Sequence, residues 1–172
     1  MLGSLFLPYH TKRSSKKSIR RYSCTYADAS TIGLICSYQS LIGENVIDDF
    51  VKRLEQAGKK VSLLVFHENS SNTDGLANNS FSKNDLSFFG LWKKEQVRAF
   101  IAKEFDFLLL LDLDYNLYIS NIIAQSRAHC RIGVYNEEPK PFLELMIKPE
   151  ESSLTKLIDE THDLLGRLKN EE

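Results

Sequence analysis

The segment "FLLLLDLDYN", residues 107–116, joins five consecutive apolar residues to a polar end that holds two aspartates. A strand with one buried face alternates apolar and polar residues, whereas a strand covered by helices on both faces is apolar throughout. The run from Phe107 to Leu111 therefore predicts a central strand of a layered sheet. The polar end predicts a turn that leads into a helix near Leu117.

Other segments repeat this alternation of strand and helix. Apolar or alternating runs predict further strands at residues 31–38, 60–68, 131–136 and, nearer an edge, 141–149. Helical periodicity predicts helices at residues 46–57, 93–105, 116–129 and 153–169. Residues 81–92 are ambiguous, because Phe88 and Phe89 fit a brief strand or a packed turn. The pattern predicts an α/β fold: a mainly parallel, open, Rossmann-like sheet of about five strands with helices on both faces.

The formal net charge of −1 conceals a strong asymmetry along the chain. The first 27 residues contain no acid and six of the 22 basic residues, so residues 28–172 carry 16 basic against 23 acidic residues. We therefore expect two parts, a basic N-terminal arm at 1–27 and a single α/β domain at 28–172. The basic residues of the arm are Lys12, Arg13, Lys16, Lys17, Arg20 and Arg21.

The start of the arm is also apolar. Leu2, Leu5, Phe6 and Tyr9 have the spacing of one helix face, but Pro8 is expected to interrupt that helix. We expect the arm to be mobile or loosely docked.

Several classes of protein are disfavoured by absences in the sequence. The longest apolar run has five residues, far fewer than a membrane-spanning helix needs. Three widely spaced cysteines favour neither a disulfide framework nor a zinc site, and they suit a cytoplasmic protein. No glycine-rich nucleotide loop, nucleophile elbow or metalloprotease motif is present. We expect no catalytic residues, cofactor or metal.

In an open parallel sheet, ligands bind outside the carboxyl ends of the strands. Polar residues at these ends should therefore form one rim, which is our candidate ligand site. It comprises Asp112, Asp114, Asn116, His67, Glu68, Tyr135, Asn136 and Glu137.

Structural roles compete with ligand binding at this rim. Asp114 or Asn116 would cap the following helix by accepting its first amide hydrogens, and Asp112 would bond a neighbouring loop. The Asp-x-Asp pair is also a weak divalent-cation signal. His67 and His129 have the chemistry of general bases, but packing or capping suits them better.

The segments "TIGLICSY", "FSKNDLSFFGLW", "EFDFLLLLDLDYNLYISNIIAQSRAHCRIGVYNEE" and "FLELMI" together resemble a family of small bacterial α/β proteins of unknown function. That resemblance implies no activity. Residues 105–136 alone also resemble the strand–helix–strand unit in the N-terminal half of heptosyltransferase-type glycosyltransferases. Those enzymes need a second domain, for which 172 residues leave no room.

Two functions fit these observations. The first is a non-catalytic binding or adapter protein whose basic arm engages an anionic membrane surface, RNA or a protein partner, which would make it peripheral at the membrane. The alternative is a nucleotide- or sugar-binding enzyme, or a degenerate glycosyltransferase-like domain, that uses the carboxyl-end rim. A simpler interpretation is that the arm is a solvated tail.

Overall fold

A computed structural model of the chain describes residues 3–15, 24–43, 45–68, 79–114, 116–135 and 142–168. The strands are β1 Thr31–Ser37, β2 Lys60–His67, β3 Ser80–Ser82, β4 Phe107–Leu110, β5 Cys130–Val134 and β6 Leu145–Ile147. They form one sheet in the order β3-β2-β1-β4-β5-β6, and all neighbours are parallel. This is the strand order of Rossmann-type sheets. The predicted α/β class is confirmed, with six strands in place of about five.

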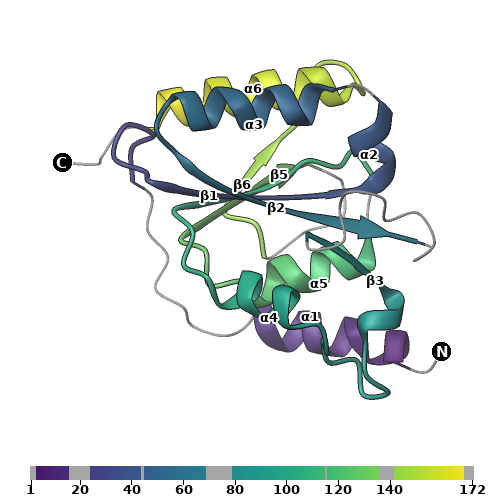
Figure 1. Cartoon of the computed structure of the whole chain (residues 1–172). Coiled ribbons are helices and arrows are strands. Elements are labelled where there is room, and N and C mark those ends of the chain that lie inside the picture. The colour runs from purple at the N-terminus through teal and green to yellow at the C-terminus, as the bar shows by residue number, and fades with distance from the viewer. Residues whose placement is uncertain are drawn as a thin grey trace.

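Helices lie on both faces of the sheet (Figure 1). They are η1 Gly3–Phe6, α1 Leu7–Ser15, α2 Tyr38–Gly43, α3 Val46–Gln56, η2 Lys83–Asp85, α4 Glu95–Ala102, α5 Leu117–Gln125 and α6 Leu154–Arg167. One face is covered by α3 and α6, and the other by α1, α4 and α5. In the described part of the chain, no helix has the length and apolar content that crossing a bilayer requires.

The apolar run from Phe107 to Leu111 lies in the middle of the sheet, as predicted. β4 pairs with β1 on one side and with β5 on the other. Phe107, Leu109 and Leu111 pack under α3 and α6, while Leu108 and Leu110 pack towards α4 and α5. All five side chains are at most 5% exposed, because each face of this strand is covered by helices.

The two outer strands of the sheet, β3 and β6, are short and differ from the prediction. β3 has three residues and was not predicted, while Phe88 and Phe89 lie in a turn. β6 covers only three of the nine residues expected at 141–149. Glu144 lies just before β6 and is not part of the strand. Its Oε1 accepts a hydrogen bond from Nη2 of the buried Arg131 of β5 at 2.6 Å.

The N-terminal segment departs most from expectation. Pro8 does not interrupt the helix, because it lies in the first turn of α1, where a backbone N–H has no helical partner to lose. Leu7 is wholly buried in the core beneath α5. The predicted apolar stripe faces solvent instead: Leu5, Phe6 and Tyr9 are all exposed, and Leu2 lies outside the described residues.

A buried asparagine on α5, Asn121, fixes the position of α1. Trp92 Nε1 donates to Asn121 Oδ1 at 2.9 Å, and Asn121 Nδ2 donates to Thr11 Oγ1 at 3.0 Å. A buried amide is costly unless its hydrogen bonds are made, so this network favours one position of α1 on α5. Residues 3–15 are therefore docked on the domain, whereas residues 16–23 lie outside the described ranges.

The segment that leads into β1 is held to the body by a buried lysine. Lys59 Nζ donates to the carbonyl oxygens of Tyr26 at 2.6 Å and of Ala29 at 2.8 Å. The ammonium group also lies 4.5 Å from the centre of the Tyr26 ring. Residues on either side of the predicted 27/28 boundary are thus tied to the sheet.

We predict that Leu7→Ala lowers the free energy of unfolding by about 2–5 kcal/mol, because it leaves a cavity under α1. Leu5→Ala is the matched control, since Leu5 is exposed and its truncation should change stability by no more than about 0.5 kcal/mol. Urea unfolding followed by circular dichroism measures both variants. Equal, small effects would show that α1 does not contribute to the core.

Candidate functional site

The centre of the sheet contains the point at which the strand order reverses. The chain leaves β1 towards α3 on one face and leaves β4 towards α5 on the other. Parallel sheets bind ligands outside the carboxyl ends of the strands at such a point. A cleft of about 620 Å³ opens here, which is large enough for a small ligand. Its lining residues are Ser37, Gln39, Ser40, Glu68, Asp112, Leu113, Asp114, Asn116, Ser152, Ser153 and Leu154.

Asp112 joins the ends of the two central strands at the base of the cleft. Its Oδ2 accepts from the Ser37 backbone N–H at 3.0 Å, and its Oδ1 accepts from the Ser37 hydroxyl at 2.8 Å and from the Ser40 hydroxyl. The residue is 5% exposed. The carboxylate thus spans the gap between β1 and β4, and it binds groups of the protein itself.

The pKa of Asp112 is raised above the ordinary value for an aspartate. Burial is the main cause, and it outweighs the bonds from Ser40 and Ser37, which favour the ionised form. The negative charge of Asp114 raises this pKa further. The ionised carboxylate is therefore held in place at some electrostatic cost.

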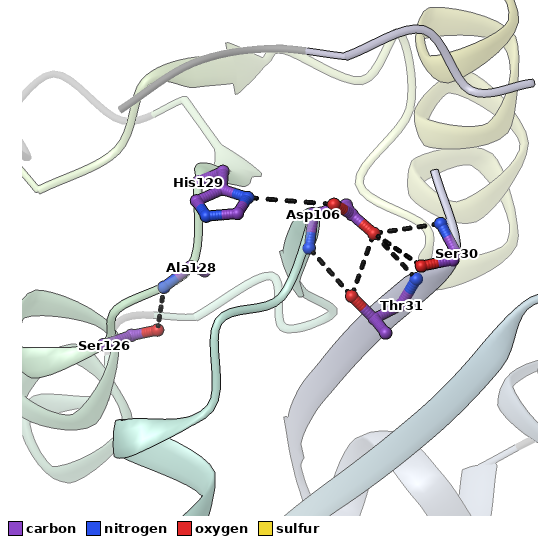
Figure 2. A network of polar contacts seen from close by, with 6 residues as sticks. All are labelled: Ser30, Thr31, Asp106, Ser126, Ala128 and His129. Carbon is purple, nitrogen blue, oxygen red and sulfur yellow. Dashed lines mark hydrogen bonds and ion pairs between the residues drawn. The ribbon is translucent and has the colours of Figure 1, made fainter. Parts of the chain in front are cut away.

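A second aspartate performs the same task at the opposite end of these strands. Asp106 Oδ2 accepts from the backbone N–H groups of Ser30 at 2.9 Å and Thr31 at 2.8 Å, and from the Thr31 hydroxyl at 2.9 Å. Figure 2 shows its carboxyl group between these residues and His129, whose Nδ1 lies 3.7 Å from Asp106 Oδ1. Burial alone would raise the pKa of Asp106, but the bonds from Ser30 and Thr31 outweigh it and lower the pKa.

His129 belongs to this amino-end network and not to a helix end. α5 stops at Gln125, and the Ala128 N–H donates to Ser126 Oγ at 3.0 Å in the turn that follows (Figure 2). His129 therefore precedes β5 at the amino ends of the strands, opposite the cleft.

Asn116 is the cap of α5. Its Oδ1 accepts from the backbone N–H groups of Tyr118 at 3.0 Å and Ile119 at 3.1 Å, so this alternative from the sequence is confirmed for Asn116. Ser153 caps α6 in the same way by accepting from the Lys156 N–H. Asp114 is exposed and has its carboxylate at the mouth of the cleft.

Two of the predicted rim residues lie away from the cleft lining. His67 is 3% exposed and packs on the ring of Tyr38, with centroids 4.5 Å apart. No described residue bonds His67 Nε2, and burial together with the charge of Lys94 lowers the pKa of this histidine. Tyr135 is exposed beyond β5, where its N–H donates to the Ile147 carbonyl oxygen.

The structure thus brings Asp112, Asp114, Asn116 and Glu68 to one cleft. The predicted site residues Asn136 and Glu137 lie outside the described residues. Sequence reasoning missed the polar lining residues Ser40, Ser152 and Ser153. The spacing of Ser37 and Ser40 is the one signal that points to Ser40, because residues three apart face each other on one helical turn.

The chemistry of the cleft disfavours phosphate. Nine of its eleven lining residues are polar, three are carboxylates, and none of the described lining residues is basic. Two of the amide hydrogens that open α5 are bonded to Asn116, and one of those that open α6 is bonded to Ser153. Nor do the described residues place three or more histidine, cysteine or acidic side chains where they would hold a metal ion. The surface suits a ligand that donates hydrogen bonds.

Of the predicted anion-binding residues, the structure describes only Lys12 and Arg13, and neither lines the cleft. Lys12 and Arg13 are exposed in the last turns of α1. Lys16, Lys17, Arg20 and Arg21 lie outside the described residues.

Comparison with known proteins identifies the family alone. The model of a family of unknown function, DUF6913, matches residues 5–168, so the chain belongs to this family. No curated protein and no solved structure matches it. The local resemblance to heptosyltransferase-type enzymes and the bacterial origin therefore stay predictions from the sequence.

We predict that Asp112→Ala lowers the free energy of unfolding by about 1–3 kcal/mol, because the Ser37 N–H loses its buried acceptor. Asp112→Asn should cost less, since the amide oxygen can still accept from that group. Asp114→Ala is the control and should have little effect, because Asp114 is exposed. Thermal and urea unfolding measure all three.

The two Asp112 variants also differ in pH dependence. With its pKa raised on folding, Asp112 contributes full stability below its unfolded-state pKa of about 3.9, and loses that contribution as pH rises through the raised pKa. Asp112→Asn lacks this loss. Its unfolding free energy relative to wild type should therefore improve from about pH 3 to about pH 7. A constant difference would contradict the raised pKa.

Proposed function

We propose that this member of the DUF6913 family is a non-catalytic protein that binds an anionic surface through its basic N-terminal segment. The surface would carry phosphates, from the lipids of a membrane or from RNA. This function makes the protein peripheral at such a surface and requires neither a cofactor nor a bound metal.

The observation that carries the proposal is a basic helix anchored to the α/β domain. Leu7 and Asn121 hold α1 in place, and Lys12 and Arg13 lie exposed beyond them. Residues 3–15 contain no acid, and four more basic residues follow within the next six positions, 16–21. A basic residue held near an anionic membrane contributes about 1 kcal/mol, and salt screens this attraction.

We predict that the double charge reversal Lys12→Glu/Arg13→Glu weakens binding to anionic vesicles or RNA by about tenfold or more. Binding of wild type should weaken as salt is raised, and less so for the variant. Co-sedimentation with vesicles that contain phosphatidylserine and fluorescence anisotropy with labelled RNA are the measurements.

The matched control is Lys60→Glu/Lys156→Glu, which changes net charge equally at exposed positions away from α1. It should retain most of the binding. If both double variants bind equally well, the N-terminal segment is not the binding surface. Removal of the whole segment is a poorer test, because it would also remove Leu7 from the core.

The carboxyl-end cleft favours a second candidate function. Its many polar groups, and the absence of basic side chains among the lining residues that the structure describes, support the binding of an uncharged, hydroxyl-rich ligand such as a sugar, and disfavour a nucleotide. Exposed carboxylates such as Asp114 accept hydrogen bonds from neighbouring hydroxyl groups.

We predict that simple sugars raise the melting temperature of the protein, whereas nucleotides do not. Asp114→Ala should reduce the shift without altering the melting temperature of the free protein, because Asp114 is exposed. If nucleotides raise the melting temperature and sugars do not, the cleft binds nucleotides and the sugar assignment is wrong. The absence of any shift with sugars would remove the second candidate.

A further inference from the structure

Exposed apolar side chains are concentrated at one place on the protein. Eight large apolar residues of the described chain are exposed, and six of them come from two short segments around α1 and the loop after η2. We call these six the apolar patch; they are 40–70% exposed and comprise Leu5, Phe6, Tyr9, Phe88, Phe89 and Leu91. Contiguous apolar surface of this kind marks an interaction site.

The loop that supplies half of the patch is a closed and ordered hairpin. Leu86 and Trp92 form an antiparallel bridge at its base, where both side chains are buried. Across the turn, the Ser87 N–H donates to the Leu91 carbonyl oxygen at 2.7 Å. Gly90 has a φ of +75°, a conformation that favours glycine. The exposed rings at the tip are therefore held out by the backbone.

The hairpin packs directly on the N-terminal helices, so the two halves of the patch are continuous. The His10 ring lies within hydrogen-bonding distance of the Phe89 carbonyl oxygen, with Nε2 at 3.0 Å. A Cβ added at Gly90 would lie 2.8 Å from the Gly3 carbonyl oxygen and 3.0 Å from Phe6 Cβ. Figure 1 shows the loop beside the start of α1, on the side of the helices that faces away from the sheet.

The two segments that supply the patch carry only basic charges, and the nearest acids in the chain, Asp85 and Glu95, lie just outside them. Residues 3–15 and 86–94 contain no acidic residue. They contain four basic residues, of which Lys12, Arg13 and Lys93 are exposed and Lys94 is half-buried. An apolar surface with a basic border complements the acyl chains and the anionic headgroups of a lipid bilayer.

We propose that the apolar patch inserts into the interface of an anionic lipid bilayer. This inference rests on the proposed function and names the partner as lipid. The rings of Phe88 and Phe89 and the side chains of Leu5, Phe6 and Leu91 enter the boundary between headgroups and acyl chains. Lys12, Arg13 and Lys93 contact the headgroup phosphates, and the sheet stands above the membrane.

The test combines Phe88→Ser/Phe89→Ser with vesicles of phosphatidylcholine that contain or lack phosphatidylserine. Each ring is more than half exposed, so the variant should fold, which thermal unfolding checks. Loss of the two rings should lower the vesicle partition coefficient by about tenfold or more. Tyr135→Ser/Met146→Ser removes exposed apolar groups elsewhere and should bind as wild type does.

The single tryptophan reports insertion directly. Trp92 is 6% exposed and lies at the base of the hairpin, next to Leu91. Lipids brominated near the headgroup end of the acyl chain should quench its fluorescence in wild type, and less in the serine variant. Quenching must require vesicles that contain phosphatidylserine.

The outcomes separate this inference from the proposed function. If charge reversal at Lys12 and Arg13 weakens vesicle binding but the serine variant binds and quenches as wild type does, the protein binds an anionic surface without insertion and the inference is overturned. A different result would be that the serine variant loses binding to RNA while wild type does not bind vesicles. In that case the patch stacks on bases, and lipid is the wrong partner. If wild type inserts equally into vesicles without phosphatidylserine, the patch inserts without anionic lipid, which overturns the inference as stated and the proposed anionic specificity with it.

Discussion

The pairing of β1 with β4 is the constraint on which the rest of this structure depends. The two strands are the middle of the sheet, and aspartates at both ends of the β4 segment hold them together. Asp106 accepts from the backbone and hydroxyl of Thr31, and Asp112 accepts from the backbone and hydroxyl of Ser37. Between them, five apolar residues fill both layers of the core. An apolar strand can slide along a similar neighbour, and two bonded ends oppose such a shift.

The same bonds determine what the carboxyl end of the sheet can bind. In dinucleotide-binding sheets of this strand order, backbone N–H groups after the first strand receive phosphate. Here the Ser37 N–H and the nearby hydroxyls already receive the carboxylate of Asp112. A resident negative charge at this point opposes a second one, so the fold retains the cleft while its chemistry differs from that of a nucleotide site.

The docking of α1 explains why apolar residues remain at the surface. Leu7 and Thr11 lie one turn apart and contact the core and the Asn121 amide, respectively. With this face of α1 inward, Tyr9 on another side of α1 is exposed, and so are Leu5 and Phe6 of the preceding η1. The hairpin that ends at Trp92 is held by the same asparagine. One buried amide thus fixes both halves of the apolar patch.

The sequence by itself determined the class of fold and the centre of the sheet. A run with no polar residue is compatible with a strand only when both faces are covered, so local composition was enough to place residues 107–111. It also determined the polar end of β4 and limited the cap of the following helix to Asp114 or Asn116, since these roles depend on neighbouring residues in the chain, and the structure selects Asn116. Only the tertiary structure decided which side of α1 is buried, because two apolar faces compete there and the amide donor that selects Thr11 is 110 residues away at Asn121. It also decided that Asp112 faces Ser37, since bonds between distant segments depend on strand register, which no local pattern records.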